Sequence, residues 1–137
     1  MHLTDQDFMQ QALHLAEHAE AVGEVPVGAI VVLDQKIIGR GFNQPISTHD
    51  PSAHAEMLAL REAASNIGNY RLSKATLYVT LEPCMMCMGA MVHARIERVV
   101  FGAPDSKKAL NHVLKMEGGI LAEECGQKLK AFFQQRR

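Results

Sequence analysis

The sequence lacks the features expected of a membrane or secreted protein. Its longest apolar stretches are short and are broken or bounded by glycine or histidine, as in Ala29–Leu33 and Met85–Val92. A membrane span needs about 20 apolar residues. The first five residues carry no basic segment followed by an apolar run, so we expect no secretion signal. These absences predict a cytoplasmic protein with no membrane partner.

The sequence also has almost no net charge and few cysteines. The formal charge is −1 over 137 residues, so a nucleic-acid partner would have to be met by a local basic patch or a deep pocket. Three cysteines are an odd number for a disulfide framework, and two of them, Cys84 and Cys87, are spaced C-x-x-C. This pattern favours a role for Cys84 and Cys87 as metal ligands in a reducing compartment, and it assigns no partner to Cys125.

Apolar residues are plentiful enough for one folded domain. They make up 47% of the chain against 21% charged residues, and no repeat or low-complexity linker divides residues 1–137. The patterns predict the following elements: a capped helix over 5–21, a β-hairpin over 25–33 and 36–42, a polar loop over 43–51, a helix opening at Pro51 after an Asp50 cap, a strand over 76–80, a buried helix opening at Pro83 and apolar nearly all round over 85–94, a strand over 99–101 and a last helix through 121–132. Such an order predicts an α/β domain of three layers.

Two short segments carry the chemistry, and each opens a predicted helix. Cys84 and Cys87 are three residues apart and can close on one metal ion. His54 supplies a third ligand, and one imidazole with two thiolates is typical of a catalytic zinc whose fourth position is open to water. Side chains two positions apart in a regular helix point about 200° away from each other, so His54 and Glu56 could not both face a metal beside the helix. The metal must therefore lie over the end of that helix.

A closed structural zinc site is the alternative. It would need a fourth ligand, for which Cys125, His49 and His93 are the candidates, but none of them stands in a second spaced pair. Glu56 favours catalysis instead, because a carboxylate beside zinc-activated water can accept a proton and return it.

The H-x-E and P-C-x-x-C pattern is typical of zinc-dependent nucleobase deaminases. Beyond the ligands, the chain resembles the family of bacterial tRNA-specific adenosine deaminases, which belongs to the cytidine and deoxycytidylate deaminase superfamily. The resemblance covers nearly the whole chain and is carried by these segments: Glu24–Ala29, Asn43, His49–Glu56, Thr76–Cys84 and Val99–Ala103.

The resemblance implies a three-layer α/β/α cytidine-deaminase-like fold with a central mixed sheet of about five strands. It also implies one Zn²⁺ per chain, a homodimer, and hydrolysis of adenosine to inosine at the wobble position of a tRNA anticodon stem-loop, with Glu56 as the proton shuttle. Substrate contacts are implied for Asn43, Ala55, Val25, Pro26 and Asp105. Taken alone, Asn43 and Asp105 could equally be turn residues.

Two departures from the family pattern stand out. Gln44 replaces the arginine that usually follows the substrate-binding asparagine. The segment between Asp105-Ser106-Lys107 and Asn111-His112 is also shorter than usual, with only three residues between these motifs. In the family, the missing residues normally lie beside the surfaces that face RNA and the second subunit, so the shortening bears on dimer formation and on affinity for tRNA.

Two other functions stay open. The same ligand pattern occurs in deaminases of free bases or nucleosides, and a zinc-stabilised RNA-binding module without catalysis would also keep the ligands. For RNA contacts, Phe133 lies off the core stripe of the last helix and could stack on a base or pack on a neighbouring chain. A basic patch could draw on the following residues: Lys74, Arg95, Arg98, Lys107, Lys108, Lys128, Lys130, Arg136 and Arg137.

Overall fold

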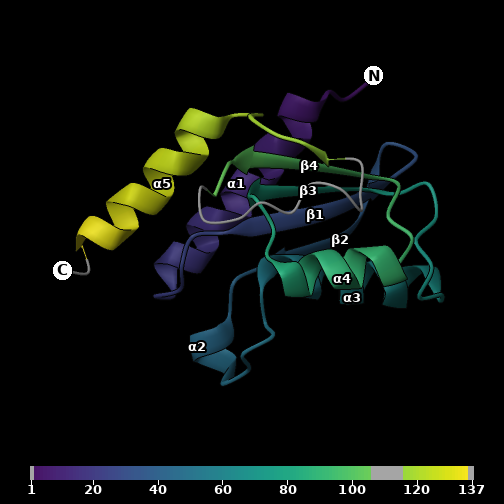
Figure 1. The fold of residues 1–137 in the computed structure, drawn as a ribbon, viewed down its shortest axis with the longest axis horizontal. Coiled ribbons are helices and arrows are strands. Elements are labelled where there is room, and N and C mark those ends of the chain that lie inside the picture. Colours follow the sequence, from purple (N-terminus) through teal and green to yellow (C-terminus); the bar gives the residue numbers. More distant parts are fainter. Residues whose placement is uncertain (1, 106–115, 136–137) are drawn as a thin grey trace.

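The computed structural model describes residues 2–105 and 116–135. Its centre is a five-stranded mixed sheet with the strand order β2-β1-β3-β4-β5 (Figure 1). β1 runs antiparallel to both β2 and β3, whereas β3, β4 and β5 are parallel to one another. The strands are β1 (Gly28–Leu33), β2 (Lys36–Phe42), β3 (Thr76–Leu81), β4 (Arg98–Ala103) and β5 (Met116–Glu117).

Five helices complete the described part of the chain, and none of them is long and apolar enough to cross a membrane. They are α1 (Asp5–Ala21), α2 (Pro45–Thr48), α3 (Ala55–Ile67), α4 (Met85–His93) and α5 (Ala122–Gln135). The predicted capping box at the start of α1 is confirmed, since Thr4 and Asp7 exchange both of its hydrogen bonds.

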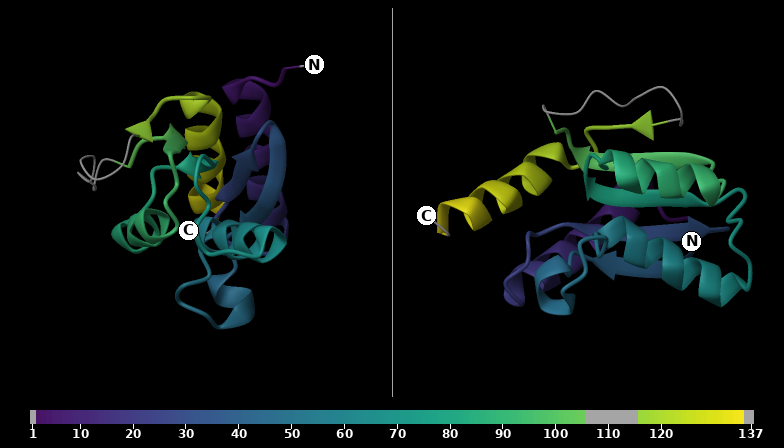
Figure 2. Two further views of the ribbon diagram at one scale, coloured as in Figure 1. Left: turned by 90° about the vertical axis from the view of Figure 1, so that its right-hand side faces the viewer. Right: turned by 60° about the horizontal axis from the view of Figure 1, so that its bottom comes forward.

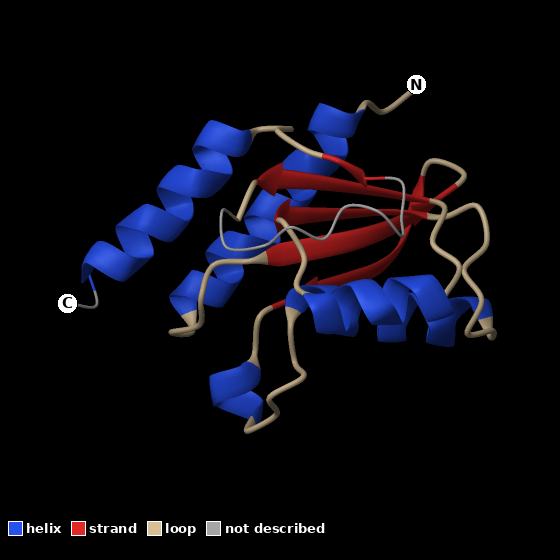
Figure 3. Cartoon of the chain, in the orientation of Figure 1, coloured by secondary structure: helices blue, strands red, loops and turns tan. Residues whose placement is uncertain are grey.

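The sheet separates two hydrophobic layers because side chains alternate along each strand. Val31, Leu77 and Val99 face α3 and α4 and belong to the larger core. Ile30 and Tyr78 face the other way, toward α1. Figure 2 shows the helices on both sides of the sheet, and Figure 3 shows the same layers by secondary structure. The predicted three-layer α/β/α fold is therefore confirmed.

α3 lies unusually close to β2, at a place where β2 carries glycine. An ideal Cβ on Gly41 would stand 2.3 Å from the carbonyl oxygen of Ala55 and 2.7 Å from the backbone nitrogen of Ala59. Only a residue without a Cβ fits there. The strand thus sets the position of the first turns of α3, where His54 and Glu56 lie.

The second long helix begins later than the sequence predicted. Its first residue is Ala55, and the N-cap is His54, so the prediction of an Asp50 cap and a start at Pro51 is wrong. The Asp50 carboxylate instead accepts hydrogen bonds from the backbone nitrogen and the hydroxyl of Ser52, at 2.9 and 2.7 Å. Such local side-chain turns compete with helix formation.

Other boundaries also moved. The first strand begins at Gly28 rather than Val25, and the loop predicted over 43–51 contains the short helix α2. α4 begins at Met85 with Cys84 as its N-cap, two residues after the predicted start. The helix is apolar nearly all round, as predicted, but the expectation that it is buried is wrong for one side, because Met85 and Met86 are exposed, at 70% and 39%, whereas Met88 and Met91 are buried.

Candidate active site

The sheet topology brings the starts of α3 and α4 together. β2 and β3 are each antiparallel to β1, so β2 and β3 run in the same direction and end at the same edge of the sheet. α4 begins just after β3, and α3 follows β2 through the loop that contains α2. The metal-ligand candidates therefore meet although 30 residues separate His54 from Cys84.

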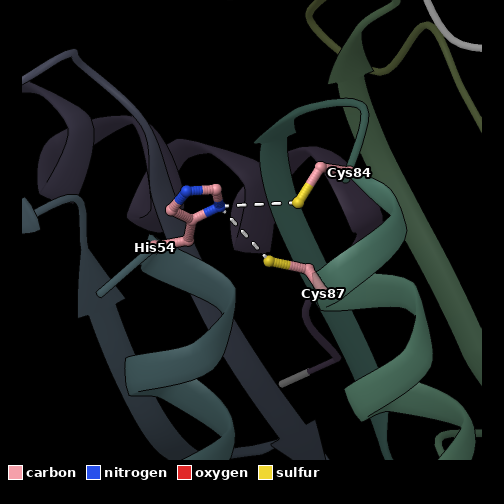
Figure 4. Close-up of side chains that lie close together, drawn as sticks. All are labelled: His54, Cys84 and Cys87. Atoms are coloured by element: carbon pink, nitrogen blue, oxygen red, sulfur yellow. Dashed lines mark hydrogen bonds between the residues drawn. The ribbon is translucent and has the colours of Figure 1, made fainter. Parts of the chain in front are cut away.

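Three ligand atoms converge at this edge. The Nδ1 atom of His54 lies 3.5 Å from the Sγ atoms of both Cys84 and Cys87 (Figure 4). With Zn–N and Zn–S bonds of about 2.0 and 2.3 Å in tetrahedral geometry, the nitrogen and sulfur ligands should be about 3.5 Å apart. The observed spacing fits a zinc ion.

No fourth residue joins this group within the described part of the chain. The potential ligand atoms that lie within 4.8 Å of one another come from His54, Cys84 and Cys87 alone. The candidates for a closed site, Cys125, His49 and His93, are not among them. Three protein ligands leave the fourth tetrahedral position for water or substrate, as in catalytic zinc sites.

Glu56 lies beside the ligands in the first turn of α3. Its side chain is 4% exposed. Burial first, and then the negative charge of Glu56, raise the pKa of the Cys87 thiol, to which the carboxylate is also hydrogen-bonded. A divalent cation here would offset both effects, because it deprotonates a coordinating thiol outright. The acidic surroundings of Cys87 thus suit a metal site.

The substrate-binding candidates Asn43 and Ala55 touch each other next to the ligands. The Oδ1 atom of Asn43 accepts a hydrogen bond of 2.9 Å from the backbone nitrogen of Ala55. The backbone nitrogen of Asn43 donates to the carbonyl of Val27, at 3.1 Å, so the segment with half-buried Val25 and buried Pro26 lies alongside. Four of the five predicted substrate residues therefore belong to one neighbourhood.

The family is shown by a direct match. The model of the cytidine and deoxycytidylate deaminase zinc-binding region covers residues 3–103. The chain belongs to this family. It is a zinc-dependent deaminase, and His54, Cys84 and Cys87 form a group that could hold the metal ion.

Deaminases named tRNA-specific adenosine deaminase are similar over almost the whole chain. The protein of Haemophilus influenzae is 54% identical over 147 positions, covering 97% of this chain and 85% of that protein. The protein of Bacillus subtilis is 44% identical, with 97% and 91% coverage. Because 147 aligned positions exceed the 137 residues present here, the first relative contains residues that this deaminase lacks.

Solved structures include two informative neighbours. A chain from a study of A-to-I editing by tRNA:A34 deaminases has a TM-score of 0.84 and 38% identity, covering 89% of this deaminase and 98% of that chain. Guanine deaminase from Bacillus subtilis has a TM-score of 0.71 and 38% identity, covering 74% and 66%.

The fifth substrate candidate of the deaminase, Asp105, is tied to the segment that leads into Cys84. Its backbone nitrogen donates a 2.8 Å hydrogen bond to the Oε1 atom of Glu82, and Glu82 stands two residues before Cys84. Sequence reasoning did not single out Glu82. The shortened segment after Lys107 lies outside the described residues.

Two members of the proposed basic patch are engaged in ion pairs. Arg98 pairs with Asp5 at 2.5 Å and also with Glu117. Lys128 pairs with Glu17 and Glu20, at 3.5 and 3.4 Å. These residues support the packing of α1, β5 and α5 rather than a free positive surface. Lys107, Lys108, Arg136 and Arg137 lie outside the described residues.

The two phenylalanines of α5 differ as expected. Phe132 is 4% exposed and Phe133 is 52% exposed, and their rings meet edge to face at 5.2 Å. Phe133 is thus available to stack on a base or on another chain.

Proposed function

We propose that this deaminase hydrolyses adenosine to inosine at the wobble position of a tRNA anticodon loop. The observation that carries the proposal is the open three-ligand site beside a buried Glu56, with both His54 Nδ1–Sγ distances at 3.5 Å. The substrate follows from the similarity to proteins named tRNA-specific adenosine deaminase, at 54% identity over 97% of this chain. We place the reaction in the cytoplasm, where reducing conditions keep Cys84 and Cys87 available as ligands.

The chemistry needs a nucleophile and a movable proton. His54, Cys84 and Cys87 would hold the zinc ion, which would supply the Lewis acidity that lets water act as a nucleophile at neutral pH. Glu56 accepts the proton of the attacking water and delivers it to the ring nitrogen next to the amino-bearing carbon. The water oxygen bonds to that carbon, and a second proton, from the newly attached hydroxyl, goes to the amino group as its C–N bond breaks, so that adenosine and water give inosine and ammonia.

Asn43 and its neighbours are proposed to hold the nucleoside. The carbonyl oxygen of the Asn43 side chain accepts the Ala55 N–H, so its amide NH₂ group is the part that can donate to the substrate. Val25 and Pro26 supply an apolar wall next to it. Such a pocket fits a base taken out of its stack.

Asp105 is proposed to contact the backbone of the anticodon loop. Its position is fixed through Glu82, which leads directly into the Cys84 segment. Single-stranded loops with unstacked bases are the usual targets of sequence-specific RNA recognition. The formal net charge of −1 is compatible with binding of a single RNA loop, which has fewer phosphates to contact than a long duplex.

We also propose a homodimer that uses the surface of α3 and α4. A shallow apolar groove of about 240 Å³ runs between these helices, and its lining includes Leu60, Tyr70 and Ala90. Tyr70 is 61% exposed and Met85 is 70% exposed, and exposed apolar patches of this kind mark protein interfaces. Tyr70→Asp should shift the protein from dimer to monomer in sedimentation analysis, whereas an unchanged mass would contradict this interface.

The alternative with specific support is deamination of a free base. Guanine deaminase from Bacillus subtilis shares the fold and 38% identity. A non-catalytic RNA-binding module has less support, because Glu56 is buried next to the metal ligands, where a purely structural site gains nothing from a carboxylate.

One assay separates these functions. Zinc-loaded protein is incubated with an anticodon stem-loop carrying wobble adenosine, and in parallel with free adenosine, cytidine and guanine. Inosine in the stem-loop alone is the expected result. Turnover of a free base or nucleoside alone would replace the proposed substrate with a small molecule, and zinc-loaded protein without any turnover would favour the non-catalytic module.

A further inference from the structure

Glu24 is the most deeply buried carboxylate in the described part of the chain. It is 1% exposed, whereas Glu56 is 4% exposed. Acidic residues are almost never fully buried unless they are paired. Its position therefore calls for partners that compensate the loss of water.

Both oxygens of Glu24 bind the backbone of α2. Oε2 accepts a 2.7 Å hydrogen bond from the backbone nitrogen of Ser47, and Oε1 accepts one of 3.3 Å from that of Ile46. Hydrogen bonds to a charged acceptor are stronger than those between neutral groups. The contact spans 22 and 23 residues of sequence, so it joins the loop after α1 to the loop before α3.

α2 has little else to hold it. None of its residues is buried, its N-cap Gln44 makes no side-chain capping bond, and Ile46 is 66% exposed. Figures 1 and 2 show α2 projecting away from the sheet at the end of the molecule where α3 begins. Without apolar anchoring, the orientation of this helix depends on its polar contacts.

The loop that contains α2 forms part of the rim of the active site. Asn43 precedes α2 and His54 follows it, and the base of the loop is closed by the bonds from Ala55 to Asn43 and from Gln44 to Ala53, both 2.9 Å. Glu24 itself directly precedes Val25, whose segment lies beside Asn43 through the hydrogen bond from Asn43 to Val27. Its carboxylate thus links this segment to the loop that runs from Asn43 to His54.

We propose that Glu24 is a positioning residue, whose buried carboxylate fixes α2 and thereby the rim between Asn43 and His54 in the conformation that binds the RNA substrate. The inference rests on the proposed function. It assigns to Glu24 an effect on substrate binding, since the hydrogen bonds of its carboxylate go to the backbone of α2.

The test compares Glu24→Ala and Glu24→Gln with wild type. Glutamine keeps one accepting oxygen, so it should restore part of what alanine loses. Glu62→Ala is a matched control, because the Glu62 carboxylate also accepts a backbone hydrogen bond, from Arg40 at 3.0 Å, but does not contact α2. Zinc content, hydrogen exchange of the Ile46 and Ser47 amides, kcat and KM for the anticodon stem-loop are measured for each.

In Glu24→Ala we expect faster exchange at Ile46 and Ser47, and a rise in KM of about tenfold or more, as loss of a charged hydrogen bond would give. kcat and zinc content should stay near wild type, and Glu24→Gln should be intermediate. Unchanged amide exchange, an unchanged KM, or a fall in kcat alone would overturn the inference. If Glu24→Ala fails to fold, Glu24→Gln decides the test. The inference then requires that the KM of Glu24→Gln exceed the KM of Glu62→Ala.

The outcome for wild type is separate. If wild type leaves the stem-loop unchanged, the proposed function fails and this inference fails with it. If wild type is active and Glu24→Ala has the same KM, the inference about Glu24 alone is wrong.

Discussion

Gly41→Ala should disturb the active site indirectly, by displacing the first turns of α3. The new Cβ would lie 2.3 Å from the carbonyl oxygen of Ala55, although real Cβ contacts are essentially never below 3.0 Å. The atoms that it meets are backbone, so no side chain can turn aside. α3 or β2 must therefore move by about 0.7 Å, the difference between these two distances.

This movement would act on His54 and Glu56, which lie at the same end of α3. Overpacking of this kind costs about 1–3 kcal/mol of stability. A misplacement of about 1 Å at reacting groups can cost about 100-fold in rate, so we expect a fall in kcat of about 10- to 100-fold and weaker zinc binding.

The assay combines urea unfolding, zinc content and turnover of the anticodon stem-loop. Gly126→Ala is the control, because a Cβ there meets nothing within 4 Å. Since Gly126 lies inside α5, alanine should raise stability by about 0.5–1 kcal/mol and leave turnover unchanged. A Gly41→Ala protein with full zinc content and wild-type kcat would refute the argument that β2 sets the position of the site.

The remaining predictions concern single groups. Glu56→Ala should retain zinc, because Glu56 is not a ligand, but lose at least about 100-fold in kcat; normal turnover would refute its role as proton shuttle. Cys87→Ala should lose zinc and thermal stability together, and a chelator should destabilise wild type in the same way; retained zinc by elemental analysis would contradict the ligand assignment. Burial raises the pKa of Cys125 from 9.0 to about 11, so the folded protein holds this proton more tightly than the unfolded chain. The resulting stability is present below pH 9 and is lost as the pH rises toward 11; Cys125→Ala should therefore show a shallower fall in Tm over this range, and equal slopes would show that the shift is absent.

The helix starts illustrate where local sequence patterns mislead. Asp50-Pro51 is a good helix opening by residue preference, yet the chain turns there through Asp50 and Ser52, and the helix waits until Ala55. α3 begins at the point where its first turns, Ala55 to Ala59, pack against Gly41 of β2. This packing joins residues far apart in the chain, so local residue preferences cannot predict it.

Glu24 illustrates the same limit for function. A glutamate between Gly23 and Val25 reads as a surface residue of a loop. Its importance arises because α2, more than 20 residues later, turns two backbone N–H groups toward it. Pro45 is a common first residue of a helix and could have signalled α2, but nothing local indicates its partner.

Local residue types and spacings were enough to predict the groups that carry the chemistry. Imidazole and thiolate ligands, a C-x-x-C spacing that fits one helical turn, and a carboxylate two residues from the histidine are properties of residue type and short separation, and they suffice to indicate an open zinc site with a proton carrier. The fold was needed to show that His54 meets Cys84 and Cys87, that no fourth ligand from the described residues joins them, and that Glu24 and Glu82 accept hydrogen bonds from the backbone of α2 and of Asp105. These facts depend on strand order and helix packing, whose energies come from contacts between residues far apart in the chain.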